Sequence, residues 1–208
     1  MKNIKIYIAR HGQNLDNEAG ILNGHRDEPL TQLGLMQAIE LAEHLKRSEI
    51  TFDKVYTSPL LRAKVTANTI TSKLGIKSPK VLNSLIERDF GCMTGKKIDD
   101  IETLCTPDIV KAEKIVYFLS PLGAETFPQL VKRGNDVLEY IDEHNDEGTS
   151  VLLVCHGDIG KMIYTAYYNL LWEEVLTDFH FGNSELLLLS EETTPDNAHV
   201  FKQKQHNH

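Results

Sequence analysis

The tripeptide Arg10-His11-Gly12 directly follows the apolar stretch 4–9, Ile-Lys-Ile-Tyr-Ile-Ala, and this junction decides how the rest of the chain is interpreted. Isoleucines at every second position, with Lys5 and Tyr7 between them, predict a β-strand over residues 4–9. Two ionisable side chains therefore stand where a strand ends and a loop begins. Because ligand sites in open parallel sheets form beyond the carboxyl ends of the strands, we expect a site here.

Further segments alternate between strand and helix patterns. Strands are expected at 55–57, 81–86, 151–154 and 186–189, with an edge strand near Val200. Helices are expected from Thr31, from Ser58-Pro59 to Leu74, and over 127–141 and 159–171, with Thr31 and Ser58 as caps. This order predicts an α/β fold, a three-layer α/β/α sandwich with a mostly parallel central sheet.

Length and composition fit one domain over residues 1–208. The chain has 208 residues, 41% of them hydrophobic, and no Pro/Gly/Ser-rich linker divides it. Residues 95–123 show the weakest periodicity, and we expect an inserted, lid-like segment over one end of the sheet. The tail from Glu191 to His208 is polar, and the spacing of His206 and His208 indicates no metal site.

Charge and cysteine content narrow the expected partners and the compartment. A formal net charge of -8 argues against nucleic acid or an acidic membrane as partner. No run of about 18 apolar residues and no secretory leader is apparent. Cys92, Cys105 and Cys155 lack CxxC spacing, so we expect a cytoplasmic protein without disulfides or zinc. The oligomeric state is left open.

Three further polar residues are expected at the edge that carries Arg10 and His11. His156 follows the strand 151–154, Arg62 lies in the first turn after the strand 55–57, and Glu87 follows the third strand. The helix near Asp158 would add backbone N–H groups and its positive end.

Arginine forks and imidazoles suit a tetrahedral dianion such as a phosphate monoester. We therefore expect His11 to attack phosphorus in line and carry the phosphoryl group, without a metal or other cofactor. Glu87 would protonate the leaving oxygen and later activate water. Asp158 and Asp89 are alternative proton donors, and Asp158 could instead only cap its helix.

The motifs resemble those of the histidine phosphatase superfamily, which is also called phosphoglycerate-mutase-like. Five ordered stretches carry the resemblance: 10–17 (RHGQNLDN), 24–38 (GHRDEPLT through Gly34 and Gln37-Ala38), 57–67 (TSPLLRA through Thr66-Ala67), 85–95 (LIERDFG through Gly95) with 121–126 (PLGAET), and 154–158 (VCHGD).

The resemblance implies an α/β sandwich, a phosphohistidine intermediate and no metal. It makes His11 the nucleophile and Glu87 the proton donor, and it assigns Arg10, Arg62 and His156 to the phosphate pocket. Asn17 and the Gly157 amide would assist, and Asn23 and Gly24 are further candidates for substrate contact. Two features depart from the pattern, a pair of residues and a single one. Gln13-Asn14 replaces Glu-Thr or Glu-Ser, which removes a negative charge, and Ala124 replaces a glycine.

Within this family we expect a phosphatase that acts on a small phosphorylated metabolite. A mutase must hold a second phosphate, and family mutases are expected to be longer and to carry an arginine pair in the inserted segment. Here residues 95–123 contain Lys96, Lys97, Lys111 and Lys114 but no arginine, and Asp89 would repel a second phosphate.

Three alternatives stay open. They are mutase-type phosphoryl transfer, a module that binds phosphorylated ligands without catalysis, and a metal hydrolase with His11, His156, Asp158 and Glu87 as ligands, which the two arginines disfavour.

Overall fold

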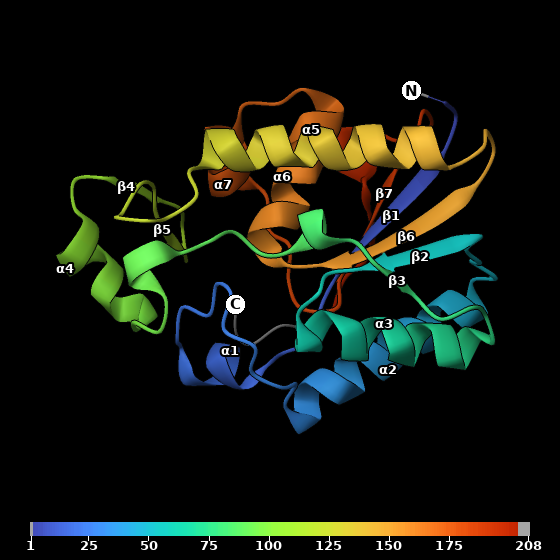
Figure 1. Cartoon of the computed structure of the whole chain (residues 1–208), viewed down its shortest axis with the longest axis horizontal. Coiled ribbons are helices and arrows are strands. Elements are labelled where there is room, and N and C mark those ends of the chain that lie inside the picture. The colour runs from blue at the N-terminus through green and yellow to red at the C-terminus, as the bar shows by residue number, and fades with distance from the viewer. Residues whose placement is uncertain (1, 204–208) are drawn as a thin grey trace.

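A six-stranded sheet forms the centre of the protein in the computed structural model, which describes residues 2–203 (Figure 1). Met1 and residues 204–208, including His206 and His208, lie outside the described residues. The strand order is β3-β2-β6-β1-β7-β8. The strands are β1 (Lys5–Arg10), β2 (Lys54–Thr57), β3 (Lys80–Val81), β6 (Ser150–Cys155), β7 (Leu186–Leu189) and β8 (His199–Phe201).

Four neighbouring strands run parallel, and two at one edge run the other way. Strands β3, β2, β6 and β1 are parallel, whereas β7 is antiparallel to β1 and β8 to β7. Arg10 pairs with Cys155, and Thr57 pairs with Val154, so β1, β2 and β6 end at the same level. Because β7 is reversed, the loop that precedes it reaches this same edge.

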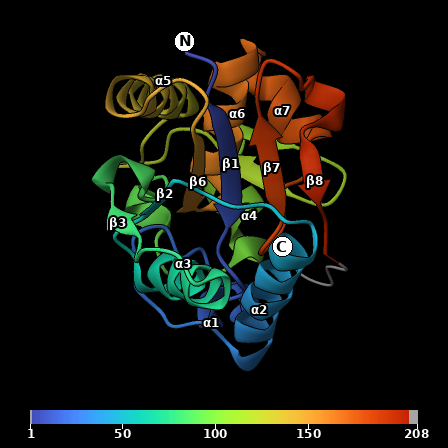
Figure 2. The same ribbon diagram turned by 90° about the vertical axis from the view of Figure 1, so that its right-hand side faces the viewer.

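Helices cover both faces of the sheet, which confirms the predicted α/β/α sandwich (Figure 2). Alternate strand residues face opposite layers: Ile8 and Leu153 pack in the core under α5, α6 and α7, and Ala9 and Leu152 in the core under α2 and α3. The helices are α2 (Gln32–Arg47), α3 (Leu61–Leu74), α5 (Phe127–His144), α6 (Gly157–Tyr168) and α7 (Trp172–Asp178). None of the helices within residues 2–203 is long and apolar enough to span a bilayer.

The helix α2 begins where its sequence predicts. The Thr31 side chain accepts a hydrogen bond from the Gly34 backbone N–H, which confirms Thr31 as the N-cap. Gly34 also lets the helix approach the loop after β1 closely, because a Cβ there would lie 2.0 Å from the Gln13 carbonyl oxygen. The first turn of α2 thereby packs directly on the backbone that follows His11.

Three predicted boundaries are wrong. The helix α3 begins at Leu61 rather than at Ser58-Pro59, and Leu60 is its N-cap residue. The expected strand 81–86 is only β3, since β2 ends at Thr57 and offers no further backbone groups for pairing. Residues 83–85 turn into a 3₁₀ helix instead, which buries Leu85 completely. The segment expected as one helix over 159–171 is also divided, because Asn169 adopts a left-handed conformation between α6 and α7.

Residues 95–123 are more regular than their sequence suggests. They form α4 (Ile101–Cys105) and a hairpin of β4 (Ile109–Lys111) and β5 (Val116–Phe118), which lie at one end of the molecule (Figure 1). Ile101, Cys105 and Phe118 belong to a small separate core that also includes Leu22 and Phe90. Elements of three to five residues are too short to establish a hydrophobic period, so the sequence pattern missed them. That this segment acts as a lid stays a prediction.

Candidate active site

Three side chains expected in the site meet through one guanidinium group. The Arg62 Nε–H lies 3.2 Å from His11 Nε2 and 3.2 Å from His156 Nδ1. The remaining nitrogens of Arg62 donate to the carbonyls of Arg26 and Gly24. All three side chains are buried, and the imidazole centroids are 5.0 Å apart. The ends of β1 and β6 and the first turn of α3 therefore assemble a buried, hydrogen-bonded cluster that carries the positive charge of Arg62.

The His11 ring is oriented by the backbone of the next residue, Gly12. Its Nδ1 lies 2.6 Å from the Gly12 carbonyl oxygen, which can only accept a hydrogen bond, so Nδ1 carries the proton. The lone pair is then on Nε2. Burial, with the charges of Arg62 and Arg10, places the pKa of His11 well below its usual value. His11 is consequently neutral and nucleophilic at pH 7.

Arg10 has a buried donor without a partner among the described residues. Its Nη1 donates to the Phe181 carbonyl at 2.8 Å, whereas its buried Nε–H has no partner among the described residues. The guanidinium lies against Gly157, where a Cβ would be 3.4 Å from Arg10 Cζ. Such an orphaned charged donor beside a helix N-terminus is suited to an anionic oxygen.

The loop before β7 holds the end of β1 in place. The Ser184 N–H donates to the carbonyls of Arg10 and His11, and the Asn183 side chain also donates to the His11 carbonyl. Residues from the far end of the chain thus fix the backbone on which both functional side chains depend.

Glu87 lies at the start of α6 and is 6% exposed. Its carboxylate accepts hydrogen bonds from the backbone N–H groups of Arg88, Asp158 and Ile159. Burial and the negative charge of Asp158 raise its pKa above the ordinary value, and the hydrogen bonds and Arg62 oppose this only in part. A carboxyl with a raised pKa can carry a proton nearer to neutral pH, as a general acid requires.

The two other acidic candidates are differently placed. Asp158 forms an ion pair with the buried guanidinium of Arg88 at 2.8 Å, and Arg88 in turn lies over the rings of Phe118 and Phe127. The Asp89 side chain is 49% exposed, bonds to the Gly91 N–H and does not line the pocket. Asp89 therefore gives no basis for repelling a second phosphate, contrary to our expectation.

The unusual pair Gln13-Asn14 has a structural role. Asn14 caps a short helix, α1 (Leu15–Ala19), in which Asn14 and Asn17 satisfy each other's backbone N–H groups. The Gln13 side chain accepts a hydrogen bond from the Thr31 hydroxyl and does not line the pocket. The substitutions thus stabilise the loop after the RHG motif.

The loop candidates differ in position. Asn17 and Asn23 line the pocket, and the Asn23 side chain also donates to Asn14 Oδ1. Gly24 instead offers its carbonyl to Arg62, and its φ of 46° brings it against the Phe90 ring, where a Cβ would be 3.1 Å away. Direct contact of these residues with substrate stays a prediction.

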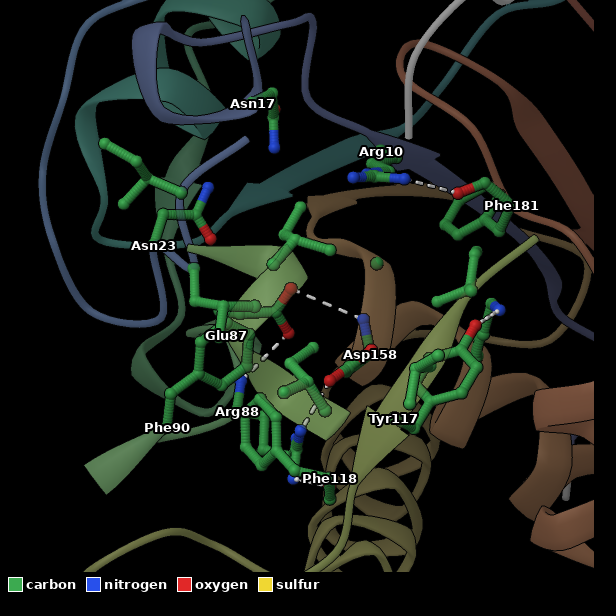
Figure 3. A pocket seen from close by; sticks show the side chains of 18 of the residues that line it. Arg10, Asn17, Asn23, Glu87, Arg88, Phe90, Tyr117, Phe118, Asp158 and Phe181 are labelled. Atoms are coloured by element: carbon green, nitrogen blue, oxygen red, sulfur yellow. Dashed lines mark hydrogen bonds and ion pairs between the residues drawn. The ribbon is translucent and has the colours of Figure 1, made fainter. Parts of the chain in front are cut away.

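A cavity of about 130 Å³ opens beside this cluster (Figure 3). Arg10, Glu87, Asp158 and Tyr117 surround the open space in Figure 3, and Gly157 also lines it. From the inserted segment the lining comprises one phenol and five apolar side chains, namely Tyr117, Ile98, Ile101, Ile115, Val116 and Phe118.

Sequence reasoning missed Arg88, Lys161 and Tyr117. Lys161 had a usable signal, since it is a lysine on an otherwise apolar helix, one turn beyond Gly157, and lysines are rarely buried without a partner. Tyr117 had none, because no period identified β5. Ser58, expected as a helix cap, lies 2.7 Å from His156 Nε2 and orients that ring.

Within residues 2–203 the side chains form no cluster of three or more His, Cys, Asp or Glu that could hold a metal ion. Arg62 lies between the two imidazoles, and Asp158 is directed to Arg88. The four ligands of a metal hydrolase are therefore not gathered around one point.

Acid should destabilise the protein through His156. Burial, followed by the charge of Arg62, places its pKa well below 6.5, so the folded state resists protonation that the unfolded chain accepts. Between the pKa of His156 in the folded protein and its pKa in the unfolded chain, only the unfolded state binds the extra proton. The free energy of unfolding therefore falls as pH decreases below about 6.5. In the His156→Asn variant, we expect the slope of the unfolding free energy against pH to decrease by the contribution of up to one proton. That contribution is about 1.4 kcal/mol per pH unit. Urea unfolding at pH 7, 6 and 5 measures it.

The matched control is His144→Asn, which removes an exposed histidine at the end of α5. An unchanged pH slope in His156→Asn, relative to that control, would contradict the assignment of His156 as a buried neutral imidazole.

Comparisons with known proteins show the family of the chain. The model of the histidine phosphatase superfamily (branch 1) matches residues 6–199. A 2,3-bisphosphoglycerate-dependent phosphoglycerate mutase from Brucella anthropi is 31% identical over 177 residues, which are 82% of this chain and 84% of the mutase. A mutase of the same name from Methylobacterium sp. is 34% identical over 74% of this chain and 75% of its own. These mutases are about as long as this chain, so the expectation that mutases are longer is wrong for them.

Two solved structures of similar shape are phosphatases. Phosphoserine phosphatase from Entamoeba histolytica, in complex with 3-phosphoglyceric acid, has a TM-score of 0.75 and 25% identity, with 89% of each chain covered. Mycobacterial glucosyl-3-phosphoglycerate phosphatase has a TM-score of 0.76 over 89% of this chain and 92% of its own. At 23% identity the second comparison supports the fold alone.

Proposed function

The chain belongs to the histidine phosphatase superfamily, branch 1, and from this premise we propose that it hydrolyses small phosphate monoesters through a phosphohistidine on His11. His11 Nε2 attacks phosphorus in line, and the bond from phosphorus to the leaving oxygen breaks. The Glu87 carboxyl gives its proton to that oxygen. Arg10 donates its unused Nε–H to a non-bridging oxygen, and Arg62, whose guanidinium His156 holds in place, supplies a second positive charge beside the phosphate.

The second half of the reaction regenerates both groups. Once the alcohol has left, Glu87 as carboxylate removes a proton from water, and the resulting hydroxide attacks phosphorus. The bond to His11 Nε2 breaks, inorganic phosphate forms, and Glu87 holds the proton for the next cycle. A raised pKa suits Glu87 to both steps, since it must gain and lose a proton in each turnover.

The residues with which the inserted segment lines the cavity favour hydrolysis over mutase chemistry. A mutase must retain the bisphosphorylated intermediate, and we expect family mutases to do so with basic residues of this segment. The lysines of residues 95–123 do not line the cavity, and the segment contributes only Tyr117 and apolar side chains to it. The proposal of a phosphatase rests on this observation.

Mutase activity is the second candidate. Its support is the name of the relatives at 31% and 34% identity, together with one basic residue of the cavity, Lys161, that is provided by α6 rather than by the inserted segment. The name of the phosphoserine phosphatase neighbour, which is 25% identical, supports the first candidate, hydrolysis.

Product analysis decides between the two. Purified protein with EDTA is supplied with small phosphate esters, and free phosphate is measured beside the conversion of 3-phosphoglycerate to 2-phosphoglycerate in the presence of 2,3-bisphosphoglycerate. We expect phosphate release to exceed isomerisation at least about tenfold. Faster isomerisation than hydrolysis would establish the mutase, and a phosphoenzyme that never turns over would establish a binding module.

A further inference from the structure

Lys161 is a buried cation that the proposed reaction does not use. Its side chain lines the cavity, and the residue is 4% exposed. It lies on α6 four residues after Gly157, so it is displaced by ~6 Å along the helix axis from the position where Arg10 meets that helix. Lys161 is therefore offset from the Arg10 guanidinium toward the inserted segment, whose Tyr117 it contacts.

The ammonium group has only one neutral partner. Lys161 Nζ donates to the Tyr117 hydroxyl at 2.7 Å and lies 5.1 Å from the centroid of that ring. Among residues 2–203 no carboxylate lies within 4.0 Å of it. The nearby acids are already engaged, because Asp158 pairs with Arg88 and Glu87 accepts three backbone hydrogen bonds.

A buried charge without a counter-ion is expensive. Two of the three ammonium donors are left for a ligand, and the Tyr117 O–H, whose oxygen accepts from Lys161, is also free to donate. Burial and the charge of Asp158 raise the pKa of Tyr117, so the phenol keeps its proton. These donors converge at the cavity wall, and the rest of that wall is mostly apolar.

We propose that Lys161 and Tyr117 form a second subsite, which binds an anionic oxygen group, either a carboxylate or a second phosphate, on the leaving group of the substrate. The proposal rests on the proposed function and names its substrate class: a short phosphate ester with a second anion. A cavity of about 130 Å³ and the single turn between Gly157 and Lys161 favour a separation of two to four carbons.

A matched substrate series tests this subsite. The ω-phosphooxy carboxylates of two to four carbons are compared with the diol monophosphates of the same length, in which a hydroxymethyl group replaces the carboxylate, and with the diol bisphosphates. We expect at least a tenfold higher kcat/KM for one anionic series over the neutral series. A carboxylate preference identifies one source of the anion and a bisphosphate preference the other.

Two variants assign the preference to this pair. Lys161→Met should lower kcat/KM for the preferred anionic series about 10- to 100-fold, with less than a threefold change for the diol monophosphates. Tyr117→Phe should produce a smaller loss confined to the same substrates, and it keeps the test valid if Lys161→Met does not fold. Lys96→Met, which removes a lysine outside the cavity lining, is the control. Equal losses on anionic and neutral substrates, or no anionic preference in the wild type, would overturn the subsite.

The pH dependence gives a further readout. Burial, followed by the charge of Arg10, lowers the pKa of Lys161 to about 8, whereas Asp158 and Glu87 oppose that shift. The ratio of kcat/KM between anionic and neutral substrates should therefore fall as pH rises through about 8, because the ammonium loses its proton there. Taking a ratio removes the titration of groups that both substrates share.

Binding separates this proposal from the proposed function. Calorimetry compares ω-phosphonocarboxylates with alkylphosphonates, which cannot be hydrolysed. If no ester releases phosphate, the phosphatase proposal fails, but tighter binding of the phosphonocarboxylates that is lost in Lys161→Met still supports the subsite. Binding that is unaffected by Lys161→Met overturns the subsite even if hydrolysis is fast.

Discussion

The His11→Ala variant is expected to release phosphate at least about 10⁴-fold more slowly than the wild type, because no other group in the cluster can form the covalent intermediate. His156 cannot substitute, since its Nε2 is directed at Ser58 and its Nδ1 faces the Arg62 guanidinium. Burst-phase kinetics with p-nitrophenyl phosphate measure the loss. Alkaline quenching with a ³²P-labelled ester should trap a base-stable, acid-labile phosphoenzyme in the wild type and none in the variant.

Binding and a distant histidine provide the controls for His11→Ala. Arg10, Arg62 and His156 remain in the variant, so inorganic phosphate should still bind, and His144→Ala should keep full activity. If the His11→Ala variant gave as much ³²P-labelled phosphoenzyme as the wild type, the phosphoryl group would be bound to another residue. That result would contradict the mechanism.

The Glu87→Gln variant is expected to lose activity in proportion to how much the leaving group needs a proton. For an alkyl phosphate we expect kcat to fall about 10²- to 10⁴-fold, because the alkoxide departs unprotonated. For p-nitrophenyl phosphate, whose leaving group is stable as an anion, the loss in the first step should be far smaller. The raised pKa of Glu87 keeps its carboxyl protonated above the usual range, so the alkaline limb of the kcat profile for alkyl esters should disappear in the variant.

Asp158→Asn and Asp89→Asn are the matched comparisons. Asp158→Asn breaks the ion pair with Arg88 and should affect both classes of ester alike. Asp89→Asn alters an exposed side chain outside the cavity and should have little effect. A loss that depends on the leaving group in Asp158→Asn, but not in Glu87→Gln, would make Asp158 the proton donor.

Much of the arrangement around His11 follows from strand ends. Arg10 ends β1, and His11 and His156 directly follow β1 and β6. Arg62 follows β2 by five residues, so a parallel sheet brings these side chains to one edge. The alternation of strands and helices likewise sufficed to predict the layers. These features depend on local patterns with a clear period, which is why the sequence contains them.

Features that depend on tertiary contacts could not be predicted. Ser58 has the local signature of a helix cap, but its hydroxyl is used by His156, which lies 98 residues away. The strand expected over 81–86 ends early because its neighbour β2 is short, and a single strand's own pattern contains no information about its partner. Tyr117 reaches Lys161 through a hairpin whose strands have three residues each.

The reversed strand β7 also determines when, during synthesis, the end of β1 can receive its support. The Asn183 side chain that supports the His11 backbone is 172 positions further along the chain. At typical rates of synthesis this separation corresponds to roughly 10–30 s of translation. During that interval the nascent chain already contains Arg10, His11 and Arg62, but not the loop that fixes the end of β1. The support of the His11 backbone is therefore completed only after residue 183 has been synthesised.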